Sequence, residues 1–170
     1  MGWLTLFFLR AGSRVGVGHQ PGLSAYAGCV AISPEHVGRS YPSTAVYDVT
    51  RQKIAEFARA LGDENPAYFG DAPIAPPTFP AVIASAAWQP FFDDPELGLA
   101  LHRTIHADQR FDYARPLRAG YRVTAELTIA KVRNRGPVAM VTIDVEVSDE
   151  QGERVVTATS QLIHTAEEAE

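Results

Sequence analysis

One apolar stripe predicts a helix in the first half of the chain. Four apolar residues recur at the i, i+3, i+4 and i+7 spacing of a single helix face, namely Ile54, Phe57, Ala58 and Leu61. Thr50 precedes the stripe, and its hydroxyl can accept a free backbone N–H. Gly62 follows it, as glycine does where a helix ends in a left-handed residue. Pro66 then prevents the helix from resuming, so we expect a sharp turn there.

A second helix is predicted from a run that is apolar on nearly every side. The run extends from Ala81 to Trp88. Thr78 is expected to cap it, Pro80 is tolerated in its first turn, and Pro90 is expected to mark its end. A helix with no polar side is expected to be surrounded by protein.

The second half of the chain changes to the period of strands. Residues 121–129 and 139–147 alternate between apolar and polar side chains, as half-buried strands do. Further strands are predicted at residues 45–49, 103–113 and 155–163, and the turn 149–152 favours a hairpin. An apolar helix needs a sheet that curls around it. The pattern predicts a single α+β domain with an antiparallel sheet wrapped around a long buried helix.

Composition narrows the class of protein. A chain of 170 residues with 46% hydrophobic and 21% charged residues fits one soluble globular domain with a real core. A net charge of -5 argues against a nucleic-acid partner. The single cysteine, Cys29, excludes an intrachain disulfide and a multi-cysteine zinc site. No run reaches the roughly 18 apolar residues of a membrane span. We expect a cytoplasmic protein.

The ends of the chain differ from its middle. The segment Trp3–Leu9 is apolar, but no positive charge precedes it as in a signal peptide, and residues 10–28 are glycine-rich without a period. We expect residues 1–30 to be a poorly ordered extension or a misassigned start. The domain is expected at residues 31–165, followed by a frayed acidic tail at residues 166–170.

Four segments resemble a known family. Phe57–Pro66 looks like the signature of MaoC-like (R)-specific enoyl hydratases and dehydratases, and three later segments deepen the likeness: Ile74–Phe79, Ile105–Phe111 and Arg115–Gly120. In particular, the chain resembles the non-catalytic accessory subunit of actinobacterial (3R)-hydroxyacyl-ACP dehydratases, which has a FAS1-like dehydratase domain. The resemblance implies the hot-dog fold.

In catalytic members of that family the motif continues Asn-Pro-x-His, and an aspartate and the histidine together hold one water. This chain carries Asp63 and Asn65, but Tyr68 stands at the histidine position. A phenol titrates near pH 10 and an imidazole near 6.5, so an ordinary tyrosine is a poor base at neutral pH. Losing a general acid or base costs about 10² to 10⁴ in rate. We expect the motif to be degenerate and the chain to be inactive alone.

The resemblance also implies a ligand and a partner. The ligand is an acyl thioester of CoA or ACP, and a related hot-dog subunit with intact Asp and His completes a heterodimer; otherwise the chain forms a homodimer. No cofactor and no metal is expected. The expected acyl-chain site runs along the second helix: Thr78, Phe79, Val82, Ile83 and Trp88.

Two other functions remain open. The chain is a non-catalytic module that binds acyl-CoA or acyl-ACP, or it is a self-sufficient hydratase that uses Asp63 with an atypical partner such as His106. Plainer interpretations also stand beside these: Asp63 and Asn65 shape a turn, His106 is structural, and Arg115 is solvated rather than bound to an acidic carrier.

Overall fold

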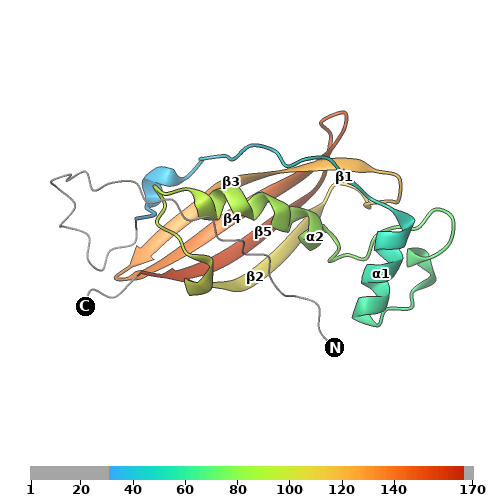
Figure 1. Cartoon of the computed structure of the whole chain (residues 1–170), viewed down its shortest axis with the longest axis horizontal. Coiled ribbons are helices and arrows are strands. Elements are labelled where there is room, and N and C mark those ends of the chain that lie inside the picture. Colours follow the sequence, from blue (N-terminus) through green and yellow to red (C-terminus); the bar gives the residue numbers. More distant parts are fainter. Residues whose placement is uncertain (1–30, 167–170) are drawn as a thin grey trace, which may run out of the picture.

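One antiparallel sheet dominates the computed structural model, which describes residues 31–166. Both the expected extension at residues 1–30 and residues 167–170 of the expected tail lie outside the described residues. The sheet order is β1-β3-β4-β5-β2 (Figure 1). Its strands are β1 (Tyr47–Asp48), β2 (Thr104–Tyr113), β3 (Arg122–Arg135), β4 (Val138–Asp149) and β5 (Arg154–Thr165).

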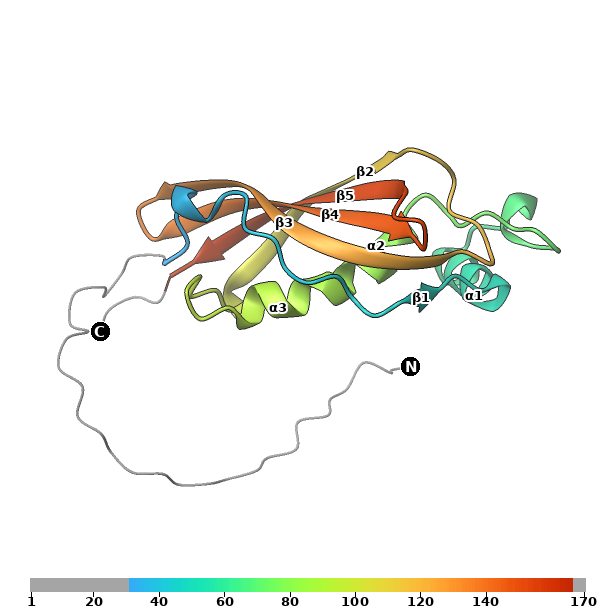
Figure 2. The same ribbon diagram turned by 90° about the horizontal axis from the view of Figure 1, so that it is seen from above.

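The central helix is built from three short pieces. It consists of α2 (Pro80–Ala84), a 3-10 turn (Ser85–Ala87) and α3 (Trp88–Asp93). Figure 2 shows α2 and α3 packed on one face of the curved sheet. The predicted architecture of a sheet wrapped around a helix is therefore confirmed, but the helix is short and interrupted. Pro90 lies inside α3 rather than at its end, following a 3-10 turn that has already changed the hydrogen-bond pattern.

The core lies between this helix and the inner face of the sheet. Ile83, Ala87 and Phe91 are buried on the helix side. On the sheet side, Leu127 of β3 faces Val145 of β4, and both are fully buried. Full burial of a large apolar side chain contributes about 1.5–3 kcal/mol, so this interface is the main source of stability.

The first helix, α1 (Arg51–Leu61), begins and ends as predicted. The Thr50 hydroxyl accepts the backbone N–H of Lys53 at 3.2 Å, and Gly62 is left-handed with φ of 69°. The last residue of the stripe, Leu61, lies within α1 but is 55% exposed.

Candidate functional site

The motif turn is closed by its own polar side chains. Asp63 Oδ1 accepts the backbone N–H of Asn65 at 3.0 Å, and Asn65 Oδ1 accepts the backbone N–H of Ala67 at 3.0 Å. Asn65 thereby caps a 3-10 turn, Pro66–Tyr68. Both side chains shape the chain locally, which is what Asp and Asn commonly do in turns.

Tyr68, at the position expected for a base, is a buried phenol. Its exposed fraction is 6%. It lies near Tyr113 of β2, where burial raises the Tyr113 pKa to about 12 and Tyr68 adds to the shift. The Tyr113 hydroxyl donates to the Pro77 carbonyl oxygen at 2.9 Å. Tyr68 of the motif turn thus acts on Tyr113, and the Tyr113 hydroxyl binds the chain just before α2.

Thr78 does not cap the central helix. Phe79 is the N-cap residue, and no side chain caps α2. The prediction is wrong because a capping side chain needs an extended N-cap residue, whereas Phe79 already has helical dihedrals of φ -54° and ψ -34°. The exposed Thr78 contributes its carbonyl oxygen instead, which accepts the N–H of Ala81 at 3.1 Å.

The remaining residues of the expected acyl-chain site fall into two groups. Phe79 and Ile83 are each 1% exposed and belong to the core. The Phe79 ring packs edge-on against Phe57, with 5.3 Å between ring centroids. Val82 is 40% exposed, and Trp88 is half-buried. The residues of the expected site therefore differ in burial, with two in the core and the others partly or largely exposed.

Trp88 contacts the exposed histidine of β2. The rings of Trp88 and His106 meet edge to face with centroids 5.1 Å apart. Trp88 Nε1 is buried and has no hydrogen-bond partner among residues 31–166. His106 and Tyr113 are seven positions apart on β2, which corresponds to about 23 Å at 3.3 Å per residue. His106 therefore lies far from the motif turn, and this separation disfavours a pairing of Asp63 with His106.

The outer face of the central helix is exposed and mostly apolar. Ala81, Val82 and Ala86 lie on it together with the polar Ser85 and Gln89, so residues 31–166 do not surround the helix as the sequence pattern predicted. Beside it, β2 is the long edge strand of the sheet, pairing with β5 alone. Exposed apolar surface next to an unpaired strand edge is typical of a protein interface.

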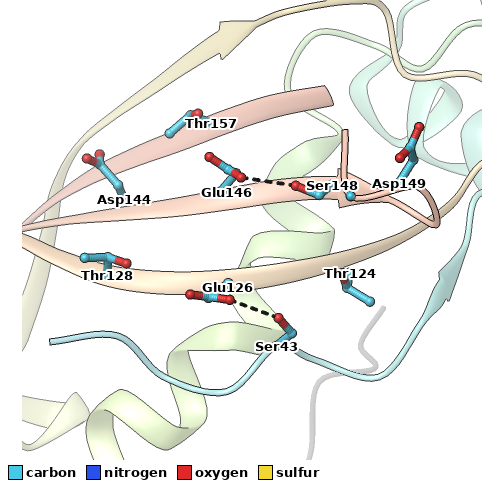
Figure 3. Close-up of a pocket in the computed structure, with 10 residues that line it drawn as sticks. Ser43, Thr124, Glu126, Thr128, Asp144, Glu146, Ser148, Asp149 and Thr157 are labelled. Atoms are coloured by element: carbon cyan, nitrogen blue, oxygen red, sulfur yellow. Dashed lines mark hydrogen bonds between the residues drawn. The ribbon is translucent and has the colours of Figure 1, made fainter. Parts of the chain in front are cut away.

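A separate hollow lies on the other face of the sheet. Its volume is about 630 Å³, and carboxylates and hydroxyls line it (Figure 3). Glu126 stands directly opposite Glu146 in the strand register. Ser43 donates to Glu126 and Ser148 donates to Glu146, each at 3.2 Å. The sequence interpretation missed this hollow, whose signal was the polar half of the strand alternation.

The hollow offers no evident metal centre. Within residues 31–166, no group of three or more His, Cys, Asp or Glu side chains could hold a metal ion. The described part of the chain also has no helix long and apolar enough to cross a membrane.

Arg115 is already engaged within the chain. Its guanidinium pairs with the Asp149 carboxylate at 2.5 Å and lies 5.2 Å from the centre of the Tyr121 ring. The hydrogen bond from Arg115 lowers the pKa of Asp149, with backbone N–H groups of the hairpin turn acting in the same direction. Arg115 therefore secures the β4–β5 turn.

Comparisons with known proteins place this geometry in context. A family profile described as FAS1-like, dehydratase domain region matches residues 35–158. A UPF0336 protein of Cutibacterium acnes is 52% identical over 139 residues, covering 82% of this chain and 98% of the relative.

Two solved structures share the fold. The truncated HadBC complex of Mycobacterium tuberculosis, a (3R)-hydroxyacyl-ACP dehydratase, is 29% identical with a TM-score of 0.66, covering 75% of this chain and 96% of that chain. A MaoC-like dehydratase is 24% identical with a TM-score of 0.69, covering 77% of this chain and 42% of that chain. These likenesses confirm the hot-dog fold expected from the sequence.

Proposed function

Because this chain belongs to the family of the FAS1-like dehydratase domain region, we propose that it is the accessory subunit of a (3R)-3-hydroxyacyl thioester dehydratase. A related hot-dog subunit carries the intact Asp and His and performs the elimination or addition of water. This chain lines the acyl-chain site and completes the assembly. HadBC, which is a complex, supports a two-subunit arrangement.

One observation carries this proposal: a buried tyrosine occupies the position of the base. Tyr68 is 6% exposed, and the neighbouring carboxylate of Asp63 is hydrogen-bonded to the backbone of its own turn. A general base must lie within hydrogen-bond reach of the substrate proton. The burial of Tyr68 and the engagement of Asp63 with its own turn disfavour that role in this chain, so the base belongs to the partner.

The exposed face of the central helix supports a partner subunit. Ala81, Val82 and Ala86 form an apolar strip that water covers in the isolated chain. A second hot-dog subunit would bury this strip and place its own motif near the start of α2. There the buried Phe79 and Ile83 would support one wall of the acyl-chain site, with Thr78, Val82 and Trp88 facing the partner.

The test is to locate the base by substitution in the assembled complex. Replacing the partner's motif histidine by alanine should lower the hydration rate of crotonyl-CoA by about 10² to 10⁴. The Asp63→Asn variant of this chain should leave that rate within about twofold. The opposite pattern would assign the chemistry to this chain. A binding module without chemistry would instead give no activity with any hot-dog partner.

A further inference from the structure

A groove lies between α1 and the loop that follows the motif turn. Its volume is about 470 Å³. Arg51, Ala55 and Arg59 contribute to one wall, and the other is formed by Tyr68, Phe69, Gly70 and Pro73. The groove is distinct from the acidic hollow of Figure 3, which lies on the outer face of the sheet.

Two guanidinium groups flank this groove on one face of α1. Arg51 and Arg59 are eight residues apart, which is about 12 Å along a helix at 1.5 Å per residue. The Arg59 guanidinium lies 5.5 Å from the centre of the Phe69 ring, which holds it against the loop. Arg51 pairs with Asp71 at 3.3 Å, and their side chains are 60% and 106% exposed. Such a solvated pair is weak, so a stronger anion can replace Asp71.

The one carboxylate on α1 does not cancel this charge. Glu56 also borders the groove, but the Lys53 ammonium pairs with it at 3.3 Å. Hydrogen bonds from Gln52 and Lys53 lower the pKa of Glu56, so its carboxylate remains charged and paired with Lys53. Arg59 also helps to lower the pKa of Glu56, but because Lys53 pairs with this carboxylate, α1 keeps a net positive charge beside the groove.

We propose that this groove binds the phosphate-bearing end of the thioester carrier. The inference rests on the proposed function and names the carrier chemistry that the chain recognises. Guanidinium groups match phosphate oxygens in charge and in planar geometry. Tyr68 lines the groove and acts electrostatically on Tyr113, whose hydroxyl donates to the Pro77 carbonyl oxygen before α2. A phosphate in the groove therefore lies beside the motif turn, to which Tyr68 belongs.

The test is equilibrium binding to the full chain by titration calorimetry. The ligands are CoA, pantetheine, which lacks phosphate, and a carrier protein bearing phosphopantetheine. We expect the double variant Arg51→Gln/Arg59→Gln to bind the phosphate-bearing ligand with about 100-fold lower affinity, at roughly tenfold per guanidinium. Pantetheine should bind weakly and equally to both proteins. Whichever of CoA and the carrier protein loses affinity identifies the source of the phosphate.

Arg133→Gln is the matched control, since it removes one exposed arginine from β3. This control should bind as the native chain does, and thermal unfolding should show that all variants are folded. The proposal is overturned if the native chain binds neither phosphate-bearing ligand, or if the double variant binds them as tightly as the native chain. Because binding is measured without turnover, a failure of the phosphate-groove proposal can be distinguished from a failure of the proposed dehydratase function.

Discussion

The Asp63 carboxylate accepts the backbone N–H of Asn65 at 3.0 Å, inside the turn that would position a base in a catalytic relative. In this chain the carboxylate thus has a structural partner within its own turn. Asn65 repeats the same contact with Ala67. Both polar side chains of the turn therefore serve to hold its backbone in shape.

Removing the Asp63 carboxylate should affect stability rather than turnover. We expect Asp63→Ala to lower the free energy of unfolding by about 1 kcal/mol, because one capped N–H of the turn loses its partner. Urea denaturation measures this loss, and Glu64→Ala at the exposed neighbouring position should change little. The dehydratase rate of the complex should persist, and a drop of about 100-fold or more would make Asp63 catalytic.

The hydroxyl of Tyr68 should be dispensable for the reaction. Tyr68→Phe keeps the buried ring and removes only the group that could transfer a proton. The rate of the assembled complex should stay within about twofold in a hydration assay, whereas loss of a general acid or base would cost about 10² to 10⁴. As a matched phenol, Tyr113→Phe removes a hydrogen bond to Pro77 and should cost about 1 kcal/mol of stability.

A charge on the outer face of the central helix should prevent association with the partner. Val82 is 40% exposed in the isolated chain, so Val82→Lys should leave the thermal unfolding of the lone chain unchanged. In the complex the same lysine would be buried without a partner, and affinity should fall at least about tenfold by analytical ultracentrifugation. Val46→Lys, at a site 46% exposed, is the control. Equal affinity for both variants would place the interface elsewhere.

His164 should make stability depend on pH. It is 2% exposed, and its Nδ1 lies 3.0 Å from Thr104 Oγ1. Burial lowers the His164 pKa below its ordinary 6.5, and nearby Arg103 acts in the same direction. The unfolded chain therefore binds a proton at His164 more readily than the folded chain does. The stability that is present above about pH 6.5 is lost as the pH falls below that value.

The expected slope is up to about 1.4 kcal/mol per pH unit below about pH 6.5. Denaturation at several pH values measures it. His164→Gln should flatten the slope, and His106→Gln, at an exposed position, should preserve it. An unchanged slope in His164→Gln would assign the effect to other groups.

Local signals in the sequence were sufficient for much of the fold. Thr50 and Gly62 bound α1 because caps act on their own neighbouring residues. The alternation in β3 and β4 predicted their buried faces because strand period is a local property. The prediction that Thr78 caps the helix was wrong because the backbone is already helical at Phe79. Capping propensity alone does not decide where this helix begins.

The site was less predictable because it depends on distant partners. The apolar residue Val82 indicates burial, yet it is 40% exposed among residues 31–166. Opposition of Glu126 and Glu146 depends on the register of β3 and β4, which a bulge between Ile129 and Lys131 shifts. The phosphate groove depends on the path of the loop after Tyr68 relative to α1, which composition does not reveal.

Whether catalysis needs a partner chain is best measured by the hydration rate of crotonyl-CoA with the purified chain, alone and then titrated with its His-bearing hot-dog partner. We expect the lone chain to turn over at the level of the uncatalysed reaction. We also expect activity that rises with added partner and saturates at one partner per chain. Turnover by the lone chain at rates typical of hydratases, unchanged by the partner, would contradict this expectation.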